Sequence, residues 1–235
     1  MPEWFETLDD RLWLRPDEMG VEEARFIKKA LRLRKGQKVL DAPCGAGRIA
    51  VHLAYAGCLI TGVDLRRQFV DRARTRFRKV GVSGDFRVMD LRNIDFTDEF
   101  HGIYNWFGSF GYFSEVEDAE VIRSYTRALR NGGRLLIEQV NRERILRHFI
   151  AEREEDWLVM RNDWQRDRQR LVTRRIIGGV DDPRNRSSMR LYTPGQMRDL
   201  FNQSGLLVED IFGFGEGGEQ FSRSSRRMVV VGRKP

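Results

Sequence analysis

A glycine-rich turn between a short strand and a helix is the feature that most constrains this chain. Lys38–Asp41 predicts a buried strand, and the turn Gly45-Ala46-Gly47 follows three residues later. A helical pattern then begins, with apolar residues at positions 49, 50, 53 and 54 on one face. Glycines in such a turn let the backbone approach a ligand, and the helix directs its free N–H groups and positive dipole end toward it. The sequence therefore predicts a nucleotide-binding unit.

Strands and helices continue to alternate after this unit. Further strands are predicted at 58–63, 85–89, 102–106, 134–140, 206–212 and 228–231, and the helical patterns lie at 18–34, 69–80 and 119–129. This alternation is typical of a parallel sheet covered by helices on both faces. We predict an α/β fold with a Rossmann-like, seven-stranded, mostly parallel sheet.

The alternation breaks after Val140. A helix is predicted at 142–151, followed by strands at 157–160, 171–177 and 188–192, and then by a helix that begins at Thr193-Pro194. Short strands joined by polar turns predict an antiparallel β meander. We therefore predict one domain over residues 1–235, with an N-terminal lid helix within about 1–34 and an inserted β segment over about 152–192. The aromatic residues Trp4, Phe5 and Trp13 are expected to fold over the ligand or to pack on the sheet edge.

Aspartates at three strand ends indicate the kind of nucleotide. Asp64 lies 19 residues past Gly45, where a carboxylate can accept both hydrogens of a ribose diol. Asp41 puts negative charge into the glycine loop, which disfavours a pyrophosphate and suits the cationic amino-acid end of S-adenosylmethionine. Asp90 can accept from an adenine amino group. An NAD-dependent oxidoreductase remains the alternative, because Gly45–Ala50 also fits the G-x-G-x-x-A pattern.

The chain resembles class I S-adenosylmethionine-dependent methyltransferases from about residue 20 to the end. Four motifs carry the resemblance: Val39–Arg48, Thr61–Leu65, Met89–Leu91 and Asn131–Glu138. Two further runs, Asn105–Phe113 and Arg190–Thr193, resemble a bacterial subgroup that acts on small molecules. The resemblance implies an enzyme that transfers a methyl group from S-adenosylmethionine to a small-molecule acceptor.

The resemblance also implies which residues bind the cofactor. Asp41, Gly45 and Gly47 would line the methionine end, and Asp64 and Leu65 would contact the ribose and the adenine. Asp90 and Leu91 would meet the amino edge of the adenine, and Asn105 and Trp106 would lie beside the sulfonium.

The acceptor should lie beyond the carboxyl ends of the fourth and fifth strands, at the open edge of the sheet. The predicted acceptor-binding residues follow those ends or come from the meander: Ser109, Phe110, Asn141 and Arg190. Because the methyl donor is already activated, the enzyme must mainly align the nucleophile, and it needs a base only if the nucleophile starts protonated. The candidate catalytic residues are Tyr112, Tyr192 and His148.

Composition restricts the remaining partners. No apolar run is long enough to span a bilayer and the N-terminus has no apolar signal core, so we expect a cytoplasmic protein with no membrane partner. Two cysteines and three scattered histidines predict neither a disulfide framework nor a metal site.

The net charge of +7 and the arginines between 161 and 175 leave RNA methylation open as an alternative. Acidic residues lie among these arginines, so charge alternation along exposed strands explains them more simply, and we predict a small-molecule acceptor. A binding module that has lost activity is disfavoured by the intact set of aspartates and glycines. The meander also has strand edges that could pair in a homodimer.

Overall fold

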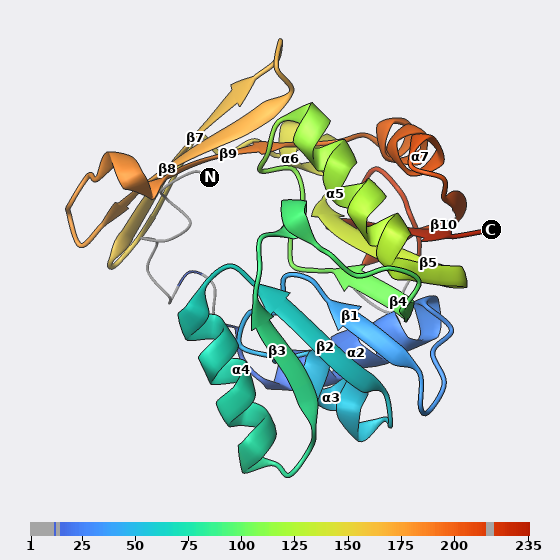
Figure 1. The fold of residues 1–235 in the computed structure, drawn as a ribbon. Helices are drawn as coiled ribbons and strands as arrows, with labels where there is room; N and C mark the ends of the chain where they lie inside the picture. The colour runs from blue at the N-terminus through green and yellow to red at the C-terminus, as the bar shows by residue number, and fades with distance from the viewer. Residues whose placement is uncertain (1–11, 13–14, 215–218) are drawn as a thin grey trace.

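The computed structural model describes residues 12, 15–214 and 219–235. Its larger sheet, sheet A, contains five parallel strands and an antiparallel edge, in the order β11-β10-β12-β5-β4-β1-β2-β3 (Figure 1). The strands are β1 (Lys38–Asp41), β2 (Leu59–Asp64), β3 (Gly84–Val88), β4 (Phe100–Asn105), β5 (Leu129–Val140), β10 (Leu207–Phe214), β11 (Glu219–Gln220) and β12 (Arg227–Arg233). The seven predicted strands are confirmed, and the two-residue β11 adds an eighth.

Helices cover both faces of sheet A and bury one hydrophobic core on each. On one face lie α2 (Glu18–Ala30), α3 (Ala50–Tyr55) and α4 (Arg67–Lys79). On the other lie α5 (Glu115–Ala128) and α7 (Pro194–Gln203) (Figure 1). Their apolar residues recur at helical spacing, which is why each helix buries a single stripe. This arrangement leaves the carboxyl ends of the parallel strands open.

The inserted meander forms a separate antiparallel sheet, sheet B, in the order β6-β7-β8-β9. Its strands are β6 (Glu152–Glu155), β7 (Leu158–Gln165), β8 (Arg170–Ile177) and β9 (Arg186–Arg190), with the 3-10 helix η3 (Pro183–Asn185) before β9. In Figure 1 sheet B projects from the main body on the side of α5 and α6 (Arg142–Arg147). The predicted meander is confirmed.

Helix α6 is shorter than the sequence predicts. The prediction of a helix over 142–151 is wrong for its last residues, because α6 ends at Arg147. Asn162 of β7 donates its backbone N–H to the Ala151 carbonyl and its side-chain amide to the Ile150 carbonyl. These bonds draw the end of the segment into sheet B.

The N-terminal region is described from α2 onward, apart from Leu12 and the residues just before the helix. Ala24 and Ile27 are buried and pack α2 against the core. The predicted contacts of Trp4, Phe5 and Trp13 lie outside the described residues. Within the described part of the chain, no helix is long and apolar enough to cross a membrane.

Candidate functional site

A cavity lies at the carboxyl ends of β1, β2 and β4. Five of the residues that line it are predicted site residues: Asp41, Gly45, Asp64, Trp106 and Ser109. The other lining residues are Arg15, Pro43, Cys44, Ala46, Arg48, Ile49, Phe69, Arg76 and Phe107. The structure therefore brings together residues from the glycine loop and from the ends of three strands.

The two glycines of the loop have different surroundings. Both have positive φ, +50° at Gly45 and +72° at Gly47. A Cβ at Gly45 would meet no atom within 4 Å, whereas a Cβ at Gly47 would lie 3.1 Å from the Cβ of Ala73 in α4. Gly45 therefore exposes its backbone to the cavity, and Gly47 lets α4 pack against the loop.

Asp64 connects the loop to the end of β2. Its two carboxylate oxygens accept the backbone N–H groups of Gly45 and Arg66, each at 2.9 Å. Burial raises the pKa of Asp64 to about 6, although these N–H groups favour its charged form. Each oxygen keeps a further lone pair, so the carboxylate can still accept hydrogen bonds from a diol in the cavity.

Asp41 is the second buried carboxylate of the cavity, with 3% of its surface exposed. Burial raises the pKa of Asp41 well above its usual value, the Tyr104 hydroxyl opposes this, and the nearby charge of Asp64 adds to it. A cationic group entering the cavity would stabilise the ionised form of Asp41.

Two arginines at the rim are already paired. Arg76 of α4 donates its Nε–H to the Ala46 carbonyl at 2.9 Å and forms an ion pair with Asp17 at 2.8 Å. Arg48 forms an ion pair with the buried Glu23 of α2. These pairs attach α2 and α4 to the glycine loop.

Arg15 lines the cavity without such a partner. Its guanidinium carbon lies 4.7 Å from the centre of the Phe107 ring, and no carboxylate among the described residues lies within ion-pair distance of it. Burial, together with the charges of Arg227 and Arg48, lowers the pKa of Arg15. An anionic ligand group in this cavity would relieve that repulsion.

The β4–α5 loop, residues 106–114, forms another wall. Phe107 and Gly108 have positive φ values of 67° and 61°. Glu138 of β5 supports this conformation, since its Oε2 accepts the Gly108 N–H at 2.7 Å while its Oε1 lies 3.0 Å from Nη1 of Arg227. Burial raises the pKa of Glu138, and Arg227 opposes the rise. A buried carboxylate thus fixes the shape of the loop beside Trp106.

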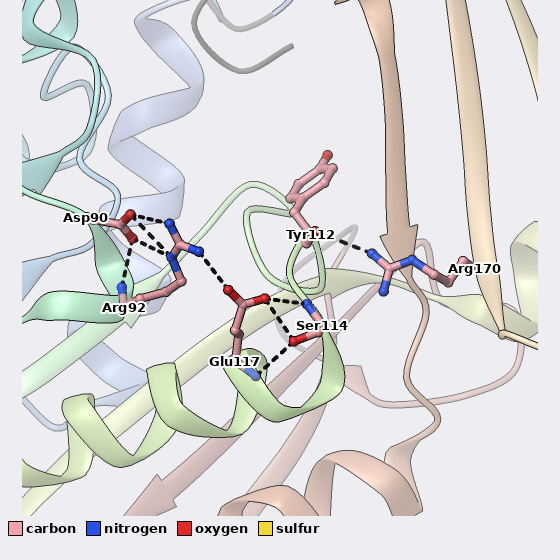
Figure 2. A network of polar contacts seen from close by, with 6 residues as sticks. All are labelled: Asp90, Arg92, Tyr112, Ser114, Glu117 and Arg170. Atoms are coloured by element: carbon pink, nitrogen blue, oxygen red, sulfur yellow. Dashed lines mark hydrogen bonds and ion pairs between the residues drawn. The ribbon is translucent and has the colours of Figure 1, made fainter. Parts of the chain in front are cut away.

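A polar network holds the far end of this loop (Figure 2). Asp90 forms an ion pair with Arg92 at 2.7 Å, and Arg92 also donates to Glu117 at 2.7 Å. The other oxygen of Glu117 accepts the N–H and the hydroxyl of Ser114, which caps α5. The predicted adenine-binding carboxylate is therefore linked to the loop through two side chains. Asp90 itself does not line the cavity described above.

Arg170 of β8 holds the same loop from the side of sheet B. Its guanidinium donates to the carbonyls of Phe113 at 3.0 Å, Gly111 at 3.1 Å and Tyr112 at 3.4 Å. In Figure 2 the Tyr112 ring points away from this backbone contact. The candidate base Tyr112 thus stands on a segment anchored from two sides.

Besides Gly47 and Asp90, three predicted cofactor residues do not line this cavity. Asn105 is fully buried, and its amide donates to the Tyr125 hydroxyl at 3.2 Å, which donates in turn to the Ala42 carbonyl at 2.9 Å. Asn105 therefore supports the glycine loop from beneath. Leu91 packs against the α5 core, and Leu65 is half-buried.

The candidate base Tyr192 and the predicted acceptor residue Phe110 are buried together. The Tyr192 hydroxyl donates to Asp118 of α5 at 2.8 Å, and its ring packs against Phe110 with centroids 5.6 Å apart. Both side chains belong to the core between α5 and α7. The structure thus gives them contacts within the protein.

Of the four remaining predicted residues, three have polar side-chain partners within the protein. The Asn141 amide donates to three carbonyls of residues 222–225, and Arg190 pairs with Glu115 at 2.7 Å. His148 is exposed at the end of α6. Ser109 lines the cavity and donates its hydroxyl to the Trp106 carbonyl.

Comparison with known proteins shows what the chain is similar to. Residues 39–133 match the family described as "Methyltransferase domain". Two curated relatives, both ubiquinone biosynthesis O-methyltransferases, come from Xanthomonas euvesicatoria (31% identical over 147 residues) and from Pseudomonas aeruginosa (28% over 145 residues). Each match covers 59% of this chain. It covers 59% of the Xanthomonas protein and 61% of the Pseudomonas protein, so the chain spans less than two thirds of their length.

Solved structures share the whole fold. The CcbJ methyltransferase from Streptomyces caelestis has a TM-score of 0.80 at 18% identity and covers 100% of this chain and 98% of its own. CalS10, an amino pentose methyltransferase from Micromonospora echinaspora, has a TM-score of 0.66 at 19% identity, with 95% and 94% covered. The chain thus shares the fold of these solved methyltransferases, and residues 39–133 are similar to the methyltransferase domain family.

Proposed function

We propose that this protein is an S-adenosylmethionine-dependent methyltransferase that acts on a small molecule. The observation that carries the proposal is the cavity at the glycine loop of the matched domain. It joins an open backbone at Gly45 to two buried carboxylates, Asp41 and Asp64.

The lining residues fit the charges and hydroxyls of this cofactor. Asp64 would accept the ribose hydroxyls, and Asp41 would face the cationic amino-acid end. Arg15, which has no carboxylate partner among the described residues, would receive the cofactor's own carboxylate. Trp106 and Phe107 supply apolar surface beside these groups.

S-adenosylmethionine supplies an activated methyl group when bound. The residues of this chain then have to orient the acceptor and exclude water. The β4–α5 loop suits that task because Glu138 and Arg170 both hold its backbone. Tyr112, on this loop, is the residue that we retain as a candidate base for an acceptor that starts protonated.

The structure also supports a small acceptor over RNA. In sheet B, Arg153 pairs with Glu155, Arg161 pairs with Glu152, and Arg174 pairs with Asp181. These arginines are therefore neutralised within the protein, which weakens a phosphate-tracking surface. An oxidoreductase is disfavoured by the domain match. Location in the cytoplasm and pairing into a homodimer stay predictions.

Isothermal titration calorimetry tests the proposal. S-adenosylmethionine and S-adenosylhomocysteine should both bind, and NAD should not. Asp64→Ala should weaken binding of either by roughly tenfold or more, because hydrogen bonds to a charged acceptor are lost, while the melting temperature shows that the variant still folds. Asp71→Ala, at a half-exposed pair with Arg74 on α4, is the matched control and should bind normally. Binding of NAD alone, or full affinity in Asp64→Ala, would contradict the proposal.

A further inference from the structure

One face of sheet B carries a single charged side chain on strands β7 to β9. The strand register shows which residues share this face: Leu158, Met160, Asn162, Trp164, Leu171, Thr173, Arg175, Ile177, Ser187 and Met189. Arg175 is the only charged residue of this set. Thr173 and Ser187, its neighbours on the face, are 8% and 5% exposed, so the arginine lies in a largely enclosed surface.

Among the described residues, Arg175 has no acidic partner. Its Nη1 donates to the Ser187 hydroxyl at 2.9 Å, and among the described residues no carboxylate lies within ion-pair distance of it. Arg174, on the opposite face of the same strand, is paired with Asp181. Burial lowers the pKa of Arg175, and Tyr112 opposes the change. A partly desolvated guanidinium with unused donors is suited to bind an anion.

Arg175 belongs to β8, the strand whose Arg170 donates to the Tyr112 carbonyl, and its charge acts on the Tyr112 hydroxyl. Burial raises the pKa of Tyr112, the charges of Arg175 and Arg227 lower it, and Glu138 raises it. The charges of these three groups therefore act on the same phenol. Arg175 comes from sheet B, while Arg227 and Glu138 come from neighbouring strands of sheet A.

This cluster adjoins the cofactor cavity. Arg227 lies over the Phe107 ring, 5.5 Å from its centre, and Phe107 lines the cavity. Because Glu138 is paired with Arg227 at 3.0 Å, the cluster has one net positive charge, that of Arg175. A group bound there would lie between the cofactor cavity and sheet B.

We propose that the methyl acceptor carries a carboxylate, and that Arg175 binds it beside Tyr112. The inference rests on the proposed function and names the class of its substrate. A carboxylate matches the single net charge and the planar fork of one guanidinium. A phosphate dianion would leave one charge unmatched beside the buried Glu138. Arg175 is thus a specificity-determining residue.

Binding of model anions tests this assignment. The protein saturated with S-adenosylhomocysteine is titrated with benzoate, phenyl phosphate and benzamide at constant ionic strength. We expect benzoate to bind more tightly than phenyl phosphate and roughly tenfold or more tightly than benzamide, since benzamide has the same shape without the charge. Arg175→Gln should reduce benzoate affinity by about the same factor and leave the affinity for S-adenosylhomocysteine unchanged. Arg174→Gln is the matched control, because it alters the opposite face of β8, and should bind benzoate as the unmodified protein does.

The other possible outcomes would contradict either this inference or the proposed function. No affinity for benzoate, equal affinity for benzamide, or unchanged benzoate binding in Arg175→Gln would overturn the inference, provided that S-adenosylhomocysteine binds. Tighter binding of phenyl phosphate would assign a different acceptor and also overturn it. Failure of S-adenosylhomocysteine to bind would instead contradict the proposed function itself.

Discussion

Asp64 is a carboxylate whose charge should control cofactor binding. Only its ionised form can accept both ribose hydroxyls, and burial raises its pKa to about 6. Affinity for S-adenosylhomocysteine should therefore be low at pH 5 and rise through pH 6 toward pH 7. Calorimetry across this range measures the effect.

A variant separates Asp64 from the other buried acids. Asp64→Asn removes the ionisation, so the rise in affinity centred near pH 6 should disappear. Asp71→Asn, half-exposed on α4, should keep it. A rise of unchanged size near pH 6 in Asp64→Asn would assign the titration to another group.

The residues of the cavity and of the charged cluster beside it differ in how readily the sequence predicts them. Asp41 and Asp64 are predictable because each ends a strand whose pattern is visible within a few residues. A second set consists of Phe107, Arg175 and Arg227, and no local sequence pattern predicts that these residues come together. They come from three segments far apart in the sequence, the β4–α5 loop, β8 and β12, which only the tertiary fold brings close. Local periodicity carries no information about such contacts.

At the scale of elements, the glycine loop makes a prediction about two similar substitutions. Gly47→Ala should destabilise the fold by about 3 kcal/mol, because a positive φ costs about 1 kcal/mol and the new methyl group would press on Ala73 at 3.1 Å. Gly45→Ala should cost only about 1 kcal/mol, since its Cβ meets open space, yet it should weaken cofactor binding.

Urea unfolding and calorimetry distinguish these two effects. The larger loss of unfolding free energy should belong to Gly47→Ala. The cofactor affinity of Gly45→Ala should fall although that variant folds at the assay temperature. The reverse order of stabilities would show that the packing of α4 on the loop has been misjudged.

The elements that sequence analysis missed are those without an apolar pattern. Strand β6 is composed of Glu152–Glu155, four charged and exposed residues, so neither period 2 nor β-propensity marks it. It forms because β7 offers an edge to pair with. Helix α7, by contrast, was predicted from Thr193-Pro194, and the structure confirms the cap, since the Thr193 hydroxyl accepts the Gln196 N–H.

At the scale of the whole molecule, side chains rather than a continuous core join sheet B to sheet A. Gln139 of β5 donates to the Arg190 carbonyl at 2.8 Å and accepts the Tyr192 N–H at 2.9 Å. The Tyr192 hydroxyl then reaches Asp118, which is fully buried. The placement of sheet B against sheet A thus depends on buried polar contacts, which fix geometry more strictly than apolar packing does.

These buried carboxylates should make the ligand-free protein less stable as pH rises. Burial raises the pKa of Asp118 to about 7 and that of Asp64 to about 6, and it also raises those of Asp41 and Glu138. A carboxyl group with a raised folded-state pKa binds its proton more tightly when folded. Its contribution is therefore complete below about pH 4 and is lost as pH rises through the folded-state pKa. The lowered pKa values of His52 and His101 act in the opposite direction. Both histidines are only partly buried, whereas the four carboxylates are almost fully buried, so the contribution of the histidines is smaller.

We therefore expect the unfolding free energy to fall by a few kcal/mol between pH 5 and pH 8, since one pKa unit corresponds to about 1.4 kcal/mol. Urea titrations at several pH values measure this.

Tyr192→Phe removes the hydroxyl that stabilises charged Asp118. It should lower stability more at pH 8 than at pH 5, where Asp118 is protonated. A free energy that rises across this range, or an equal loss in Tyr192→Phe at both pH values, would mean that these carboxylates are charged in the folded protein at pH 5. A saturating cofactor should flatten the decline, because its cation and hydroxyls favour the ionised forms of Asp41 and Asp64.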